Sequence, residues 1–131
     1  MTAENLTGLQ VNELDPNCPS RRVLDFIADK WTGLIIHELA VGTKRHSDLR
    51  RAVGGISQKM LTQTLRTLER NGLVERTVYP VVPPMVDYAL TPLGVTLVAV
   101  LSPVLTWAEE HLPDVEQARE SYAPTVQCSA R

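Results

Sequence analysis

The polar side chains with the clearest spacing in the sequence lie between Gln58 and Arg70. They recur on one side of an expected helix, and each can hydrogen-bond to a phosphate oxygen or to the edge of a nucleotide base. The set comprises Gln58, Lys59, Thr62, Gln63, Arg66 and Arg70. The opposite side carries an apolar stripe of Leu61, Leu65 and Leu68, which predicts a buried face. The segment therefore predicts a helix that leucines anchor and that presents a polar face able to bind nucleic acid.

The ends of this helix are also marked in the sequence. Ser57 is a favourable N-cap residue, and Asn71 with Gly72 is a typical C-terminal stop. The free N–H groups and the dipole at the start of a helix attract a phosphate, so we expect Ser57 and Lys59 to contact one. The alternative is ordinary capping beside a solvated lysine.

Charge is unevenly distributed along the chain. The whole chain of 131 residues has a formal net charge of −2, which by itself argues against a nucleic-acid partner. Residues 43–77, however, contain eight basic and three acidic residues, a local charge of +5. This asymmetry suits a protein that places one face on phosphates, although a solvated helical surface would produce it as well.

Composition limits the class of protein. With 44% hydrophobic and 5% aromatic residues, the chain can bury one mainly helical core. The polar start differs from a signal peptide, and the most apolar stretch, residues 93–105, is interrupted by Gly94, Ser102 and Pro103. We therefore expect a cytoplasmic protein without a membrane partner. The two cysteines, Cys18 and Cys128, form neither a disulfide framework nor a zinc-ligand spacing.

Periodicity and turn residues predict a mainly α fold with a small β-hairpin. The expected helices span residues 20–29, 31–42, 47–53, 58–70 and 92–111, and the expected strands span residues 73–79 and 86–90. Pro80 to Pro84 would form the hairpin tip, and Thr91 with Pro92 would start the last helix. We expect a flexible arm at residues 1–17, one folded domain at residues 18–112 and a tail at residues 113–131.

Short sequence motifs within this order of elements resemble those of the HxlR-type winged helix-turn-helix regulators. The resemblance rests on Cys18-Pro19, Asp29-Lys30-Trp31-Thr32, Arg50-Arg51, Gly55 to Leu61, Asn71-Gly72-Leu73-Val74 and the hairpin from Arg76 to Pro84. The resemblance covers residues 18–111, and the hairpin motif is its most specific part. One departure is His46, which stands where the family usually has Phe or Tyr.

The resemblance implies a transcription regulator that binds double-stranded DNA as a homodimer assembled through its N- and C-terminal helices. It implies an inverted-repeat operator, with helix 58–70 in the major groove and the hairpin acting as the wing. The expected DNA-binding residues are Arg50, Ser57, Gln58, Lys59, Thr62, Gln63, Arg66 and Arg76. At the wing tip, Pro83, Pro84 and Met85 either approach the minor groove or backbone, or belong to a hairpin that only packs.

Cys18 has two interpretations. Some relatives in this family use an N-terminal cysteine as an oxidant sensor, and a thiol before a helix N-terminus and near Arg21 and Arg22 is favoured as the reactive thiolate. The alternative is a small apolar residue packed at the dimer interface. A small-molecule effector is the other route by which such a regulator could respond to a signal.

Enzyme and metal chemistry have no support in the sequence. His37-Glu38 begins like a zinc-protease motif, but Val41 occupies the position of the second histidine. No glycine-rich phosphate loop and no nucleophile pattern accompany the histidines, so we predict no catalytic residue, no metal and no cofactor. The competing function is a winged-helix module that contacts another protein and never binds DNA.

Overall fold

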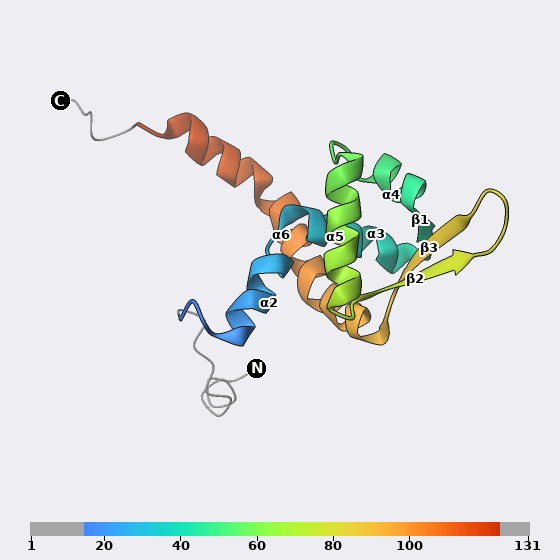
Figure 1. The fold of residues 1–131 in the computed structure, drawn as a ribbon. Coiled ribbons are helices and arrows are strands. Elements are labelled where there is room, and N and C mark those ends of the chain that lie inside the picture. Colours follow the sequence, from blue (N-terminus) through green and yellow to red (C-terminus); the bar gives the residue numbers. More distant parts are fainter. Residues whose placement is uncertain (1–14, 124–131) are drawn as a thin grey trace. The chain divides into compact units, whose positions relative to one another are not determined.

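The computed structural model describes residues 15–123, and these form five helices and one small sheet (Figure 1). The elements in chain order are α2 (Pro19–Ile27), α3 (Lys30–Val41), β1 (Lys44–Arg45), α4 (His46–Ala52), α5 (Gln58–Arg70), β2 (Val74–Tyr79), β3 (Met85–Leu90) and α6 (Pro92–Ser121). The chain divides into two compact units after Val98, within α6, and each unit is described by itself.

The predicted fold class is confirmed, with a winged helix-turn-helix order of elements in the first unit. Helix α5 matches its predicted range, and α3 and α4 each begin one residue earlier than expected. Helix α2 ends at Ile27 rather than at residue 29, because Asp29 is already the N-cap of α3 and accepts a hydrogen bond from the Trp31 N–H at 3.1 Å.

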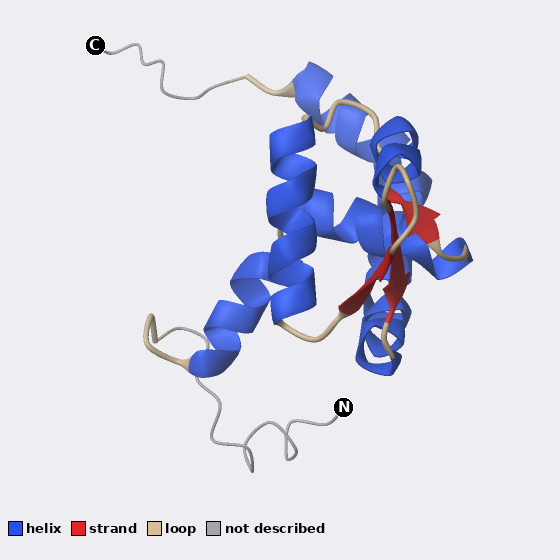
Figure 2. Cartoon of the chain, turned by 45° about the vertical axis from the view of Figure 1, so that its right-hand side comes forward, coloured by secondary structure: helices blue, strands red, loops and turns tan. Residues whose placement is uncertain are grey.

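Two features of the fold differ from the prediction. Strand β1 was not foreseen; it makes the sheet three-stranded in the order β1-β3-β2, with Lys44 opposite Tyr88 (Figure 2). Helix α6 continues through Pro113 to Ser121, whereas the sequence predicted an end near His111, with one or two separate helical turns possible between Asp114 and Tyr122. Pro103 and Pro113 both lie inside this helix, where each proline lacks the N–H that would donate an intrahelical hydrogen bond.

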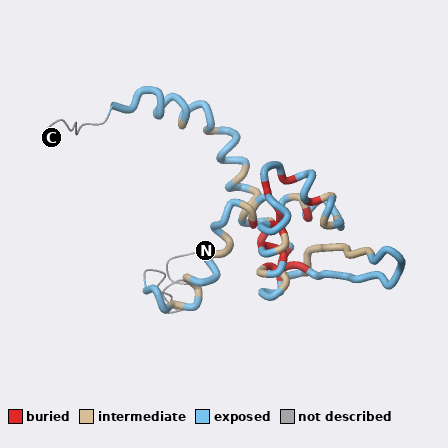
Figure 3. The backbone as a smooth tube through the Cα atoms, turned by 45° about the horizontal axis from the view of Figure 1, so that its top comes forward, coloured by how far each residue is buried: buried red, intermediate tan, exposed pale blue. Residues whose placement is uncertain are grey.

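The core of the first unit gathers on one face of α5. Leu61, Leu65 and Leu68 are 1% exposed or less, as are Ile35 and Ile36 on α3. Figure 3 colours the buried positions red, and the outer part of the hairpin has none. Each large aliphatic side chain buried to this degree contributes about 1.5–3 kcal/mol relative to an exposed one. The leucine stripe of α5 and the apolar face of α3 therefore hold the polar face of α5 toward solvent.

A tight junction joins the end of α5, the base of the wing and the start of α6. Gly72 has a φ of +79°, which lets the chain leave α5 in the left-handed conformation. The Thr91 hydroxyl donates to the carbonyl oxygen of Gly72 at 2.6 Å and accepts from the Gly94 N–H at 3.0 Å. The Leu73 carbonyl accepts from the Thr91 N–H at 3.1 Å and lies directly against the α-carbon of Gly94.

We predict that Gly94→Ala lowers the free energy of unfolding by about 3 kcal/mol, because the added Cβ would lie 2.1 Å from the Leu73 carbonyl oxygen. Gly33→Ala in α3 is the matched control: its Cβ would have no atom within 4 Å, so the helix should gain about 0.5–1 kcal/mol. Urea unfolding measures both. Equal stability of the two variants would contradict this account of the junction.

Candidate nucleic-acid interface

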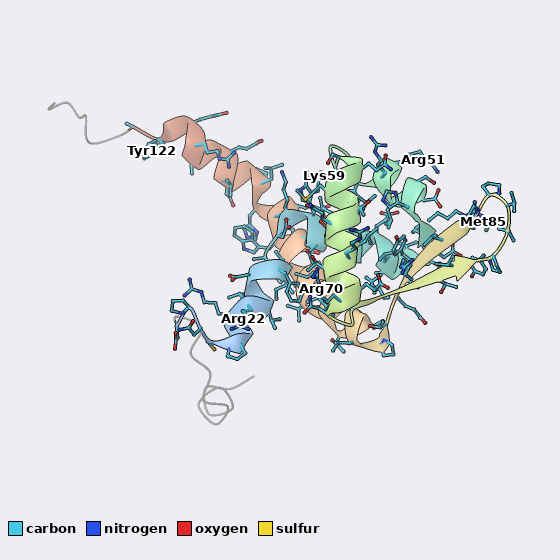
Figure 4. The ribbon with its side chains drawn as sticks, viewed as in Figure 1. Arg22, Arg51, Lys59, Arg70, Met85 and Tyr122 are labelled. Carbon is cyan, nitrogen blue, oxygen red and sulfur yellow. The ribbon has the colours of Figure 1, made fainter. Side chains whose placement is uncertain are left out.

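The exposed face of α5 brings together the polar residues that their helical spacing in the sequence predicted to share one face. Five of them line one open hollow on the surface: Gln58, Lys59, Thr62, Gln63 and Arg66. Thr62 is partly buried and the other four are exposed. Figure 4 shows Lys59 and Arg70 at opposite ends of α5, so positive charge is present along the length of the helix. This face has the amide and guanidinium groups that can form paired hydrogen bonds with base edges.

The start of α5 is built to receive an anion. Ser57 is the N-cap, and its hydroxyl oxygen accepts a hydrogen bond from the Met60 N–H at 3.1 Å. Helix geometry leaves the N–H groups of Gln58 and Lys59 without an intrahelical acceptor. With the exposed Lys59 ammonium on the same turn, these groups form a site suited to a phosphate.

Arg76 on β2 connects the wing to α5. Its Nε lies 3.4 Å from both carboxylate oxygens of Glu69 on α5, in an ion pair whose side chains are both exposed by more than a third. Arg66, Glu69, Arg76 and Tyr88 line a small polar cavity of about 210 Å³ between α5 and the wing. Arg76 is therefore beside the α5 face but shares its charge with Glu69.

His46 is a further residue at this site, and the sequence analysis assigned it no role. Its Nε2 lies 3.1 Å from the Thr62 hydroxyl oxygen, and its ring centroid lies 6.4 Å from that of Tyr88. Burial, followed by the positive charge of Arg50, lowers the pKa of His46 below its ordinary value. A neutral imidazole thus links α4, the α5 face and β3. The departure from the family's aromatic residue was the only signal of it in the sequence.

Other basic residues lie on α4 and β1. Arg50 is exposed on α4, as expected. Arg45 on β1 was not predicted as a site residue; it forms an ion pair with Asp87 at 3.9 Å and donates a hydrogen bond to the Met85 sulfur at 3.6 Å. Arg45 could have been predicted from the adjacent basic residues Lys44 and Arg45 within the positively charged segment 43–77.

The wing tip consists of residues 80–84, which form an exposed loop between β2 and β3. Pro83 and Pro84 lie in this loop, and the side chain of Val82 is 99% exposed. Met85, which we expected at the tip, is instead the first residue of β3 and pairs with Tyr79. The antiparallel register limits the unpaired tip to residues 80–84, the range that the prolines predicted.

Cys18 is half-buried and is the N-cap residue of α2. Its sulfur lies 3.1 Å from the hydroxyl oxygen of Ser20. Cys128 lies outside the described residues. Within residues 15–123, no group of three His, Cys, Asp or Glu side chains is arranged to hold a metal ion.

The chain matches the family model described as HxlR-like helix-turn-helix over residues 26–116. The chain belongs to this family. The HxlR-like assignment agrees with the order of elements and with the α5 face and wing described above.

Relatives share both sequence and fold with this HxlR-like chain. The HTH-type transcriptional regulator YtfH of Escherichia coli K12 is 47% identical over 106 residues, which cover 81% of this chain and 84% of that protein. The solved structure of ytfH from Salmonella typhimurium is 46% identical, with a TM-score of 0.80 and coverage of 84% of this chain and 98% of that one. The redox regulator HypR in its reduced form is 39% identical, with a TM-score of 0.70 and coverage of 76% and 98%. This HxlR-like chain is accordingly a DNA-binding transcription regulator and not an enzyme.

We predict that His46 makes the stability of this HxlR-like protein pH-dependent. Because its pKa is lowered on folding, the neutral side chain contributes fully above the unfolded pKa of about 6.5, and the contribution is lost as pH falls toward the folded pKa. Between about pH 7.5 and 5, the wild type should lose more free energy of unfolding than His46→Phe, which cannot be protonated there. Parallel pH profiles of the two proteins in urea unfolding would show that His46 has no such effect.

Proposed function

We propose that this protein regulates transcription in the cytoplasm as a homodimer on an inverted-repeat operator. The observation that carries the proposal is the exposed α5 face, where four exposed polar side chains and Thr62 line one hollow beside the Ser57 cap. One such helix per protomer would enter a major groove, with Arg50 and Arg76 at the flanking backbone and Pro83 and Pro84 near the minor groove.

Exposed apolar side chains support the dimer. On α2, Val23 and Leu24 are each 48% exposed, and no residue of this helix is buried within the chain. In the second unit, α6 exposes Val100, Val104 and Trp107 by 56–58%. By length and composition this helix could also cross a membrane, but one such helix is weak evidence for a membrane span. In a DNA-binding family, a second copy of the chain is the partner that accounts for these surfaces.

Selection from random duplex DNA tests the proposed function directly. A dimer with two identical α5 helices should select an inverted repeat whose half-sites lie about 10 base pairs apart, one helical turn, because two-fold symmetry in the protein requires it in the DNA. Sedimentation of the complex should give two protomers per site. Enrichment of a single half-site bound by one protomer would overturn the dimer proposal, and no enrichment would favour the protein-contact module.

Lys59→Ala and Arg66→Ala form a matched pair, because each removes one cation from the same face of α5. Lys59→Ala should weaken binding to all sequences and reduce the slope of log K against log salt by about 0.9 per protomer, as expected for a lost phosphate contact. Arg66→Ala, and likewise Gln63→Ala, should relax preference at particular operator positions by about 1–3 kcal/mol. An exchange of the two phenotypes would reverse the roles of Lys59 and Arg66.

Oxidant sensing by Cys18 is part of the proposal. The thiol lies at the N-terminus of α2, where the helix dipole favours a thiolate, and the similar protein HypR is described as a redox regulator. Because diamide joins two thiols in a disulfide, we propose that it links the Cys18 thiols of the two protomers, and that it changes operator affinity in the wild type and in Cys128→Ser but not in Cys18→Ser. If thiol titration shows that Cys18 has reacted and the operator affinity is unchanged, redox sensing is excluded. A small ligand is then left as the effector.

A further inference from the structure

A third hollow, a cleft, lies where α5 faces α2 and α3. It has a volume of about 190 Å³ and is lined by residues of α2, α3 and α5 and by the Asp29 cap between the first two. Six of the lining residues carry the argument: Phe26, Asp29, Thr32, Met60, Thr64 and Thr67. The volume exceeds the roughly 150 Å³ of a protein cavity that binds benzene, so there is room for one ring and a short substituent.

Thr32 is the least expected residue in this cleft. Its side chain is 2% exposed, and it forms no side-chain hydrogen bond with any residue in the part of the chain that the structure describes. A buried hydroxyl without a partner is costly, and such groups usually have a protein, water or ligand partner. A buried polar group on the wall of a cleft indicates that the cleft binds a ligand with a hydrogen-bonding group.

The other polar groups of the cleft mainly accept hydrogen bonds. The hydroxyls of Thr64 and Thr67 already donate to the carbonyl oxygens of Met60 and Gln63, at 2.9 and 3.1 Å, so only their oxygen lone pairs are free to bind a ligand. One carboxylate oxygen of Asp29 accepts from the Trp31 N–H, and the second oxygen can accept from a ligand. The Thr32 hydroxyl and the Gln63 amide can donate or accept, and the remaining polar groups offer acceptors and one negative charge.

The apolar part of the wall suits a ring. Phe26 and Met60 are the aromatic and thioether groups of the cleft, and both attract aromatic or cationic ligands. The Lys30 ammonium lies 4.6 Å from the centroid of the Trp31 ring, and neither residue lines the cleft, so Asp29 is the charged residue of its wall. A ligand that combines N–H donors, a positive charge and a small apolar body matches this arrangement, whereas a carboxylate would be repelled by Asp29.

We propose that this cleft binds a small aromatic amine in its protonated form, of about the size of benzylamine. The ammonium group would pair with Asp29 and donate to the threonine oxygens, and the ring would contact Phe26 and Met60.

Binding of the amine would weaken DNA binding, a step that rests on the proposed function. Gln63 lines both this cleft and the exposed α5 hollow. A ligand ammonium that recruits the Gln63 amide oxygen would withdraw that side chain from a base edge. By thermodynamic linkage, bound DNA would lower the affinity for the amine by the same factor.

The binding test uses the full chain without DNA and follows titrations by NMR and calorimetry. Benzylamine should bind saturably, benzyl alcohol about tenfold more weakly, and benzoate not detectably, because the charged hydrogen bond carries the difference. Asp29→Asn keeps an N-cap of equal quality and should lose about threefold in benzylamine affinity, because Asp29 is exposed and an exposed ion pair contributes modestly. Asp25→Asn is the control, since it removes the same charge from an exposed position outside the cleft.

Thr32→Val provides a second variant, because valine keeps the shape of threonine and removes the hydroxyl. It should weaken benzylamine binding while leaving the stability of the unliganded protein equal or higher, as expected for removal of an unpaired buried polar group. No saturable binding to the wild type, or equal affinity of Asp29→Asn and Asp25→Asn for benzylamine, would overturn the proposal.

The regulatory step is tested separately on the selected operator. Benzylamine at saturation should lower the operator affinity of the wild type at least threefold and leave that of Asp29→Asn unchanged. Benzylamine binding without any change in operator affinity would overturn the regulatory step alone. Failure of the protein to bind any duplex would overturn the proposed function, and the DNA-free titrations would still decide the amine site.

Discussion

The burial of the leucine stripe of α5 is the constraint on which the rest of the structure depends. Leu61, Leu65 and Leu68 can be buried only if the helix keeps one rotation about its axis against α3. That rotation directs the polar residues on the opposite side, among them Gln58, Lys59 and Arg66, toward solvent. The stability of the core thus determines the orientation of the surface that we assign to DNA.

The wing depends on the same helix through contacts at its base. The Thr91 hydroxyl and the Leu73 carbonyl join the end of α5 to the start of α6, and Gly94 allows the backbones to approach closely. Farther along β2, the Arg76–Glu69 ion pair adds a surface contact of the kind that contributes little to stability. The position of the wing relative to α5 is therefore fixed mainly by backbone packing, and Glu69 moderates the charge that Arg76 presents.

Local signals made most of the first unit predictable from sequence. Ser57, Gly72 and the leucine spacing mark α5 through side-chain and backbone chemistry that acts within one or two turns. Strand β1 could not be found this way, because two residues carry no periodicity and the strand exists only through its pairing with β3. The role of His46 depends on contacts with Thr62 and Tyr88, which are distant in sequence, and the cleft beside Thr32 is visible only once three helices are packed.

The exposure of the wing tip has a consequence for how such a protein can diverge. Residues 80–84 lie beyond the last paired residues of β2 and β3, and Val82 is almost fully exposed. Substitutions there leave the core and the α5 cap untouched, so they escape the selection that preserves folding. If the wing tip contacts DNA as proposed, substitutions in these five loop residues change target preference at little cost in stability, whereas the buried leucines that orient α5 cannot be replaced so freely.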